Sequence, residues 1–140
     1  MVPDEARARV AGARVARLAT ADRAGRPHLI PICFALDGDT LYSAVDHKPK
    51  RTTDLRRLRN VAENPNVAVL ADHYEDDDWT ALWWVRADGR GRILERESGE
   101  ALRAVGLLRE RYAPYEDSPP AGPVLAVDVE RWSGWRGDER

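Results

Sequence analysis

Residues 28–45 place the strongest constraint on the fold of this chain. Residues 28–36 are almost all apolar, which is typical of a strand with both faces buried or of a barrel wall. Pro31 interrupts this run and has no N–H to donate to a sheet, so the strand is expected to bulge there or to lie at an edge. Asp37-Gly38 is a strong hairpin signal and leads to a second strand at Thr40–Val45. The segment therefore predicts an antiparallel sheet built from hairpins.

The rest of the chain adds further short strands and few helices. Helices are predicted over residues 4–13, 53–64 and 98–112, and strands over residues 14–20, 67–74, 80–87, 92–95 and 124–129. Asp88-Gly89 is interpreted as a turn between two of these strands, and residues 113–123 as a proline-rich loop. The inward face of the 98–112 helix is expected to hold Ala101, Leu102, Val105 and Leu108.

These elements predict one mainly β domain spanning residues 1–140. About six or seven antiparallel strands, mostly joined by short turns, leave the helices to flank the sheet, which indicates a β-barrel. A length of 140 residues is enough for one hydrophobic core.

Charge and composition exclude several functional classes. A net charge of −2 gives no basic field to recruit nucleic acid or an anionic membrane. Residues 1–7 lack the apolar core of a signal peptide, and no apolar run approaches the roughly 18 residues of a membrane-spanning helix. The single cysteine, Cys33, excludes an internal disulfide and a cysteine-based zinc site. A cytoplasmic protein is expected.

The basic corner at residues 46–55 is the best candidate for an anion site. It holds both lysines of the chain, Lys48 and Lys50. It lies between a predicted strand and a predicted helix whose N-cap is Thr52 or Thr53. A helix N-terminus presents free N–H groups and partial positive charge, which favour an anion. Two interpretations stay open from these residues alone: a phosphate-binding corner, or a solvated basic loop.

Other catalytic and metal motifs are weak. No G-x-S-x-G sequence occurs, and the three histidines, His28, His47 and His73, are scattered, so a Ser–His–Asp hydrolase is not supported. The acids at 75–78 that follow His73 favour a solvated loop over a metal site, because successive like charges repel one another. Cys33 lies in an apolar run and is interpreted as a small core residue.

Trp79, Trp83 and Trp84 lie in or beside one predicted strand. Successive strand residues point to opposite faces, so Trp83 and Trp84 do not share one barrel interior. One of the two is expected in the core, and the other against a flat ring ligand or a partner subunit.

Several stretches together carry a resemblance to a known family. In chain order they are Ala16-Arg17-Leu18-Ala19-Thr20, residues 25–34, Leu41-Tyr42-Ser43, Lys48-Pro49-Lys50-Arg51-Thr52, residues 58–67 and residues 83–89. In order and spacing they resemble the pyridoxamine 5′-phosphate oxidase-like split β-barrel superfamily. More closely, they resemble its branch of deazaflavin-dependent (coenzyme F420) oxidoreductases. The resemblance covers almost the whole chain and implies an FMN-binding-type split β-barrel.

The resemblance also implies where a cofactor binds. It implies a homodimer with two cofactors at the subunit interface, and it implies that the strand around Pro31, Ile32 and Cys33 lines the ring system. The residues implied to hold the cofactor phosphate are Ser43, Ala44, Val45, Lys50, Arg51 and Thr52. The residues implied to lie near the interface are Trp83, Trp84 and Arg86, and Trp132 and Trp135 resemble the family's aromatic C-terminal end.

The implied reaction is hydride transfer between a reduced deazaflavin and an electron-poor double bond of a small molecule. The ring carries the chemistry, which explains why no catalytic dyad is visible. FMN is the alternative cofactor, and a non-enzymatic split barrel that binds flavin or haem is a third alternative. The acidic tail of the deazaflavin needs a basic groove, for which Arg51, Arg56, Arg57 and Arg59 are candidates, although exposed helix arginines also simply solubilise. The substrate and the proton donor are not identified.

Overall fold

The computed structural model describes residues 1–45 and 52–139, with backbone only for residues 52–55. Its elements are α1 (Pro3–Gly12), β1 (Ala16–Ala21), β2 (Pro27–Ile32), β3 (Ala35–Asp37), β4 (Thr40–Ala44), α2 (Thr52–Glu63), β5 (Asn66–His73), the 3-10 helix η1 (Trp79–Ala81), β6 (Trp83–Leu94), α3 (Gly99–Arg111), α4 (Ala113–Asp117) and β7 (Val124–Arg136). Among the described helices, none is long and apolar enough to cross a membrane.

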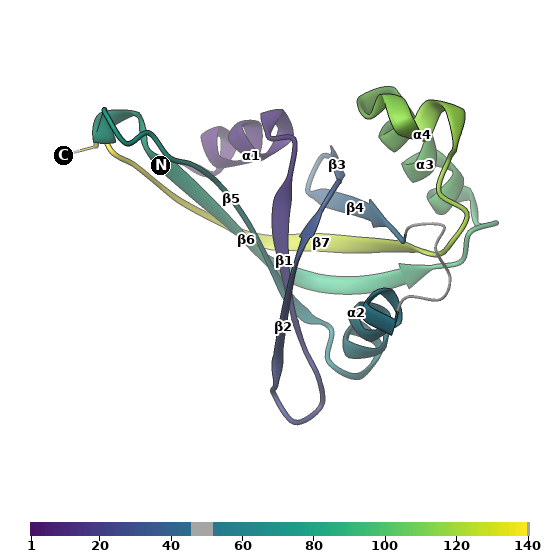
Figure 1. The fold of residues 1–140 in the computed structure, drawn as a ribbon. Coiled ribbons are helices and arrows are strands. Elements are labelled where there is room, and N and C mark those ends of the chain that lie inside the picture. Colours follow the sequence, from purple (N-terminus) through teal and green to yellow (C-terminus); the bar gives the residue numbers. More distant parts are fainter. Residues whose placement is uncertain (46–51, 140) are drawn as a thin grey trace.

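The seven strands form one sheet in the order β2-β1-β5-β6-β7-β4-β3. Every paired neighbour runs antiparallel. The sheet curls so that β2 and β1 cross in front of the long β6–β7 pair, with the helices beside it (Figure 1). This is a split β-barrel with flanking helices, as predicted. The strands β2 and β3 are its two edges, which confirms an edge position for Pro31.

The hairpin signal at Asp37-Gly38 is confirmed. Asp37 pairs with Thr40, so the loop between β3 and β4 has two residues. Gly38 takes a φ of +61°, a conformation that other residues rarely adopt.

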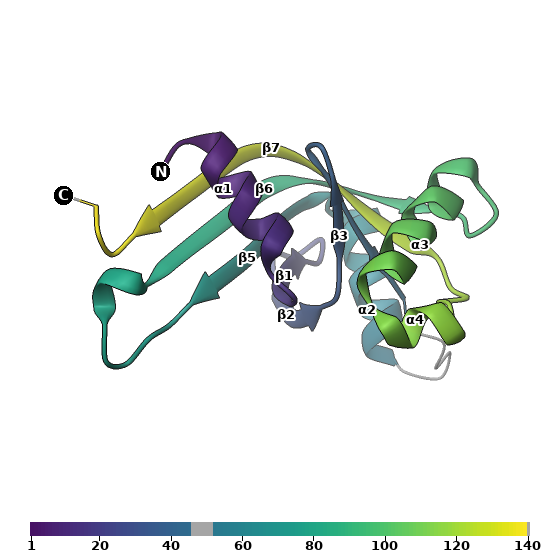
Figure 2. The same ribbon diagram turned by 90° about the horizontal axis from the view of Figure 1, so that it is seen from above.

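The main core fills the concave side of the sheet. Along β5, Val67, Val69 and Ala71 are buried while the residues between them are not, as the alternation predicts. Two helices, α1 and α2, cover this side, and Val61 of α2 lies in the main core. Ala6 and Val10 of α1 join the core, and α1 lies across β6 and β7 (Figure 2).

A second core packs α3 against the other face of β4, β7 and β6. Tyr42 and Ala126 lie here with Ala101, Val105 and Leu108 of α3. The end of α3 is tied to the β2–β3 corner, since the Tyr112 hydroxyl accepts a hydrogen bond from the Phe34 N–H at 3.0 Å.

The interpretation of Asp88-Gly89 as a turn is wrong. The strand β6 runs without a break from Trp83 to Leu94, and its register with β7 shifts between Asp88 and Gly89. A Cβ at Gly89 would collide with the carbonyl oxygen of Asp128 on β7. The glycine therefore permits close approach of two strands at a bulge, and no turn is required.

Three other expectations need correction. Leu102 is 56% exposed, because Ala101 and Ala104 provide the close contact of α3 with the sheet and Leu102 lies beside that stripe. The supposed loop at 113–123 begins with the short helix α4. The last strand extends from residue 124 to residue 136, well beyond the predicted end at 129.

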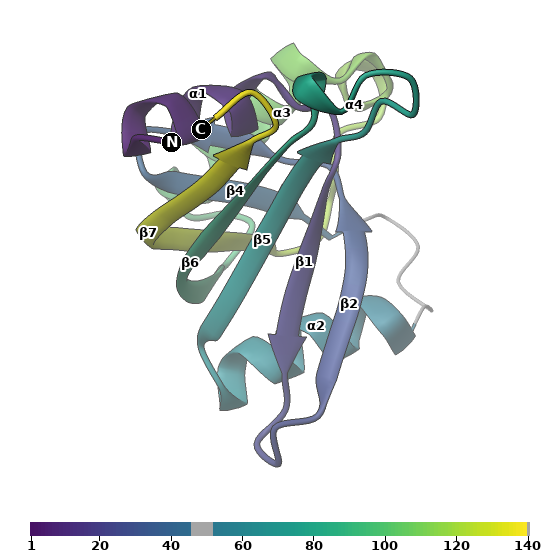
Figure 3. The ribbon, with the colours of Figure 1, turned by 90° about the vertical axis from the view of Figure 1, so that its left-hand side faces the viewer.

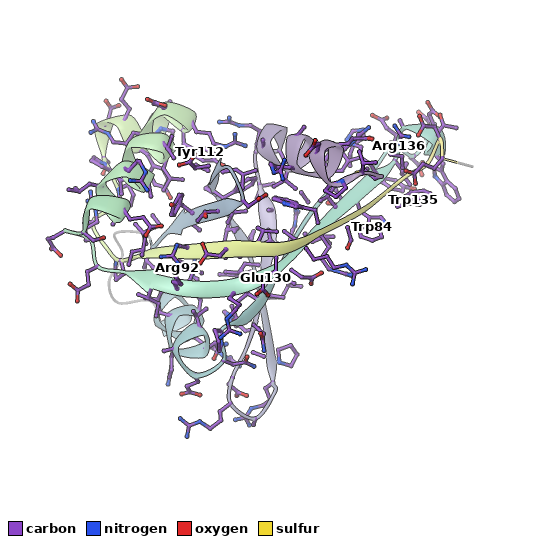
Figure 4. The ribbon with its side chains drawn as sticks, turned by 180° about the vertical axis from the view of Figure 1, so that it is seen from behind. Trp84, Arg92, Tyr112, Glu130, Trp135 and Arg136 are labelled. Atoms are coloured by element: carbon purple, nitrogen blue, oxygen red, sulfur yellow. The ribbon has the colours of Figure 1, made fainter. Side chains whose placement is uncertain are left out.

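A charged network fixes the N-terminal turn of α3 to the sheet. The guanidinium of Arg92 donates to both carboxylate oxygens of Glu100, at 3.0 and 2.9 Å, and to Asp128 at 2.6 and 3.0 Å. The Tyr42 hydroxyl donates to Glu100 at 2.8 Å, and Thr40 donates to Asp128 at 3.2 Å. One helix and three strands thus meet at Arg92, which lies along the β6–β7 ribbon (Figure 4).

Glu100→Gln is expected to lower the free energy of unfolding at pH 7 by about 1–2 kcal/mol. Hydrogen bonds from Arg92 and Tyr42 lower the pKa of Glu100 from 4.5 to about 2. Because the folded-state pKa is the lower one, the stabilisation is complete above the unfolded value and is lost as pH falls toward the folded value. Full conversion of the pKa shift would give about 3 kcal/mol, and the 41% exposure of the Arg92 side chain reduces this. Urea unfolding between pH 2 and pH 7 measures the effect, and equal acid sensitivity of variant and wild type would contradict it.

Candidate functional site

The edge strand β2 presents alternate side chains to opposite sides. Ile32 is 4% exposed and lies in the core, whereas Pro31 and Cys33 are exposed. The expectation that Cys33 is a core residue is therefore wrong, because Ile32 and Phe34 take the inward positions on either side of it. Within the described residues β2 pairs only with β1, so backbone groups along its other edge are open to a ligand.

The end of β4 is the second part of the site. Ser43, Ala44 and Val45 are 2%, 7% and 7% exposed. Their backbone is held by the ladder with β7, and the Val45 N–H donates to the Pro123 carbonyl at 3.1 Å. The end of β4, directly before the corner that precedes α2, is therefore fixed in position.

Among the phosphate-binding candidates, Lys50 and Arg51 lie outside the described residues. Thr52 is the first residue of α2, and only its backbone is described. The helix itself is firmly placed. Asn60 Nδ2 donates to Thr20 Oγ1 at 3.0 Å in a buried contact, and Val61 packs directly over Gly91, with 2.8 Å from a Val61 methyl to the position of a Cβ.

The C-terminal part of β6 adds a residue that the sequence did not indicate. Ser43, Leu125 and Ile93 lie side by side across β4, β7 and β6. Ser43 and Leu125 are buried, but Ile93 is 40% exposed. Gly91, two residues earlier on the same face, is covered by α2 through Val61, so Ile93 lies toward the N-terminal end of that helix.

Trp83 and Arg86 lie on opposite faces of β6. Trp83 packs against the main core, with the Arg9 guanidinium 5.3 Å from its ring centre. Trp84, 36% exposed, faces outward with Arg86, whose guanidinium lies 5.9 Å from the Trp84 ring centre. The expectation that Trp83 and Trp84 point to different sides is confirmed.

The two C-terminal tryptophans also separate. Trp132 contacts the core, and its indole N–H donates to Asp39 at 2.9 Å. Trp135 is 40% exposed and pairs in register with Trp84. Figure 4 shows Trp84 and Trp135 close together on the arm formed by β6 and β7.

Pro31 and Arg86 do not meet within one chain. They lie in one cross-strand row, in which Arg17 and Leu70 stand between them. Three strand spacings of about 4.8 Å put them roughly 14 Å apart. Pro31, Cys33 and Arg86 share the outer face of the sheet, whereas Ile32 and Trp83 point inward.

Three basic residues, His28 of β2 and Arg56 and Arg57 of α2, lie near one another. Burial first, and then the neighbouring Arg56 and Arg57, lower the pKa of His28. Within the described residues its Nδ1 atom is buried without a hydrogen-bond partner. His28 therefore lies on the edge strand in a positive environment, which disfavours its protonation.

The profile of the pyridoxamine 5′-phosphate oxidase family matches residues 2–136. The chain belongs to this family.

Solved structures agree with that fold. HutZ, the haem storage protein from Vibrio cholerae, is 21% identical with a TM-score of 0.71, over 95% of this chain and 90% of that one. An FAD-binding protein from Mesorhizobium loti is 22% identical with a TM-score of 0.72, over 96% and 94%. An FAD-binding protein from Mycobacterium smegmatis is 19% identical with a TM-score of 0.66, over 97% and 96%. No curated protein matched the chain.

In this member of the pyridoxamine 5′-phosphate oxidase family, the outer face of the sheet carries exposed apolar residues, most of which the sequence did not indicate. Its exposed apolar residues, which we name the outer apolar patch, are Val15, Leu29, Leu70, Trp84 and Trp135. Figure 3 shows this side of β2, β1, β5 and β6, with α2 lying behind the sheet. The sequence feature that indicates this face is the apolar run in β2, in which residues at both odd and even positions are apolar. Such a run is typical of a strand with two apolar faces.

The acidic loop that follows β5 has no metal-like geometry. His73 Nε2 lies 3.1 Å from Glu75, and the Tyr74 hydroxyl donates to Asp76 at 2.9 Å. In residues 1–45 and 52–139, no three His, Cys, Asp or Glu side chains converge as a metal site would require.

Proposed function

We propose that this chain is a cytoplasmic homodimeric oxidoreductase that uses a deazaflavin, coenzyme F420, to transfer hydride to or from an unsaturated small molecule. The observation that carries the proposal is the junction of three features: the open edge of β2, the rigid end of β4 and the start of α2. A flat ring needs an edge to lie against, and its phosphate needs a helix N-terminus. The open edge of β2 supplies the first and the start of α2 the second, and His28 of β2 lies near Arg56 and Arg57 of α2.

The residues at the junction fit an anionic ring cofactor. Arg56 and Arg57 give a positive environment near His28 of β2, whose buried Nδ1 has no hydrogen-bond partner among the described residues. The carboxylate-rich loop at residues 75–78 follows the C-terminal end of β5, whereas α2 directly precedes the N-terminal end of β5. An anion is therefore favoured near α2 and disfavoured at the far end of β5.

Each group of residues has a separate task in this proposal. Lys50, Arg51 and Thr52 bind the phosphate, and Ser43, Ala44 and Val45 hold the corner in position. The backbone around Pro31, Ile32 and Cys33 orients the ring, and Ile93 provides apolar contact near α2. When bound, the reduced cofactor supplies the hydride, from C5 of a deazaflavin or N5 of a flavin. Trp84, Trp135 and Arg86 from the partner subunit then exclude water from the ring.

Binding of the cofactor is tested by quenching of tryptophan fluorescence. Purified protein is titrated with the deazaflavin and, in a separate experiment, with FMN. We expect micromolar quenching by the deazaflavin and a weaker response to FMN. The reverse preference would move the protein to FMN-dependent chemistry. No response to either ligand would contradict the proposed function.

Lys50→Ala is expected to weaken cofactor binding by about 1–3 kcal/mol, because one charged hydrogen bond to the phosphate is lost. The same fluorescence titration measures the change in Kd. Lys48→Ala is the matched control, since it removes the same charge two positions away and is expected to have a smaller effect. Equal Kd values for Lys50→Ala and wild type would refute the assignment of Lys50.

A non-enzymatic role is the second candidate. The fold similarity to HutZ, described as a haem storage protein, favours it. Haem binding is detected by a Soret absorption band on titration, and catalysis by reoxidation of the reduced deazaflavin with a panel of electron-poor alkenes. A Soret band without any turnover would favour storage over the enzyme.

Homodimerisation is also part of the proposal, and the outer apolar patch supports it. Large exposed apolar areas on a sheet commonly mark subunit interfaces. Pro31, Cys33 and Arg86 share this face but lie far apart within one chain. A two-fold related copy placed on the face would bring such separated residues together.

A further inference from the structure

The corner between β2 and β3, made of Cys33 and Phe34, lies outside the ladders of the sheet. The strand β2 ends at Ile32, which pairs with Ala16 of β1, and β3 begins at Ala35. Within the described residues, β2 has no strand along its other edge. The polar main-chain groups of the corner therefore need partners other than a neighbouring strand.

The hydroxyl of Tyr112, at the end of α3, supplies these partners. It accepts a hydrogen bond from the Phe34 N–H at 3.0 Å, and it lies 3.0 Å from the Phe34 carbonyl oxygen and 2.9 Å from the Arg14 carbonyl oxygen. The single hydroxyl proton donates to one of these two oxygens at a time. Tyr112 lies between the α3–α4 pair and α1 (Figure 4). Both main-chain groups of Phe34 thus meet one side chain that comes 78 residues later.

Two arginines hold the aromatic rings of this cluster. The Arg111 guanidinium lies 5.0 Å from the centre of the Phe34 ring and 5.6 Å from that of Tyr112. The Arg14 guanidinium lies 4.8 Å from the Tyr112 ring centre. Arg111 also donates to two carbonyl oxygens at the C-terminal end of α1, where a cation is favoured. Because Phe34 is completely buried, its ring and its main chain are fixed together.

The position of Tyr112 is set by α3, which is fixed to the sheet along its length. In its first turn, Glu100 accepts hydrogen bonds from Arg92 and, at 2.8 Å, from the Tyr42 hydroxyl. Further along, Ala104 and Leu108 are buried in the second core. The corner at the end of the edge strand β2 is therefore tied to the helix that packs on β4, β6 and β7.

We propose that Tyr112 is a positioning residue for the cofactor ring, because its hydroxyl holds the Cys33–Phe34 corner and thereby the backbone of Pro31, Ile32 and Cys33. This inference rests on the proposed function, in which that segment orients the ring. Tyr112 acts through Phe34 and is not itself a catalytic residue. A backbone that is ordered before the ligand arrives presents its polar groups in one arrangement and lowers the cost of binding.

Two matched variants separate this role from a general effect on stability. Tyr112→Phe removes the hydroxyl and keeps the ring that lies against Arg14 and Arg111. Tyr42→Phe is the control, since it makes the same change at the other end of α3, where the hydroxyl donates to Glu100. Each variant loses a hydroxyl that ties α3 to its surroundings, but only Tyr112→Phe releases the corner.

The first measurement needs no ligand. Amide hydrogen exchange of Phe34 is followed by NMR, and the free energy of unfolding of each variant is measured in urea so that global stability can be subtracted. In Tyr112→Phe, the Phe34 N–H is expected to exchange about tenfold faster than in wild type, which corresponds to the loss of roughly one hydrogen bond. In Tyr42→Phe, its corrected exchange rate is expected to be unchanged. Wild-type protection of Phe34 in Tyr112→Phe would overturn the inference.

The second measurement uses the intact deazaflavin. Its Kd is measured by tryptophan fluorescence, and the environment of the bound ring by the circular dichroism that binding induces in the visible absorption band. Tyr112→Phe is expected to raise the Kd about five- to tenfold and to weaken the induced band, whereas Tyr42→Phe is expected to retain the wild-type Kd and band.

The outcomes distinguish this inference from the proposed function. A wild-type Kd and band in Tyr112→Phe, together with faster exchange of Phe34, would overturn the inference and leave the proposed function standing. Equal losses in the two variants would also overturn it, because the effect would then follow α3 as a whole. Absence of binding to wild type would overturn the proposed function and this inference with it.

Discussion

Gly89→Ala is expected to lower the free energy of unfolding by about 2–3 kcal/mol. The two strands β6 and β7 approach so closely at this bulge that an added Cβ collides with the main chain of Asp128 and Val129. Backbone atoms in a continuous ladder cannot swing aside as a flexible side chain can, so the strands must separate or the register must change. For a domain of this size, the loss corresponds to a fall in Tm of roughly 6–10 °C.

The chain offers a control with the same chemical change and the opposite sign. Gly106 lies in the exposed middle of α3, and nothing stands within 4 Å of the position of its Cβ. Gly106→Ala is expected to stabilise by about 0.5–1 kcal/mol, because alanine is the better helix former. Thermal unfolding followed by circular dichroism measures both variants. If Gly89→Ala unfolds at the wild-type temperature, the close contact between β6 and β7 does not exist.

The bulge also shows where local sequence signals reach their limit. An Asp-Gly pair forms a turn when strands on both sides can fold back on each other, as at Asp37-Gly38. The pair at 88–89 has the same letters, but at this point β6 is paired with β5 on one side and with β7 on the other, and both keep it extended. Whether an Asp-Gly pair forms a turn or stays within a strand depends on the strands that pair with it, which are distant in sequence. Local propensity therefore does not predict the outcome.

Alternation was the dependable signal for the fold. The alternation of Val67, Val69 and Ala71 predicts one face of a strand, and all three are buried in the main core. Helix faces were less certain. Leu102 was placed wrongly because α3 packs against the sheet through the small residues Ala101 and Ala104, whereas hydrophobicity alone favours the larger side chain.

The candidate site was only partly predictable for a related reason. The order of strand, basic corner and helix is local, so the sequence alone predicts a candidate anion site at the start of α2. A polar pocket lined by Arg26, Arg56 and Arg59 requires α2 to lie against the β1–β2 hairpin, about 30 residues earlier in the chain. No periodicity in the sequence predicts the contact between α2 and the β1–β2 hairpin. The same holds for the outer apolar patch, which gathers residues from five strands or their flanks.

Leu70→Glu is expected to convert the proposed homodimer into a monomer. Leu70 lies in the central strand of the outer face, 38% exposed, and has Arg17 and Arg86 as its cross-strand neighbours. In a dimer formed through this face, a carboxylate at this position would be buried with its two-fold copy close by. Removing a charge from water without a matched partner costs several kcal/mol, so an increase in the dimer Kd of at least about 100-fold is expected.

The matched control is Leu102→Glu. It places the same charge on an exposed leucine of α3, away from the outer apolar patch. Sedimentation equilibrium over a range of protein concentrations measures the mass of wild type and both variants, and circular dichroism verifies that each is folded. We expect wild type and Leu102→Glu to be dimers and Leu70→Glu to be a folded monomer. A dimeric Leu70→Glu would place the interface elsewhere, and a monomeric wild type would rule out a ring site completed by Trp84 and Arg86 of a second subunit.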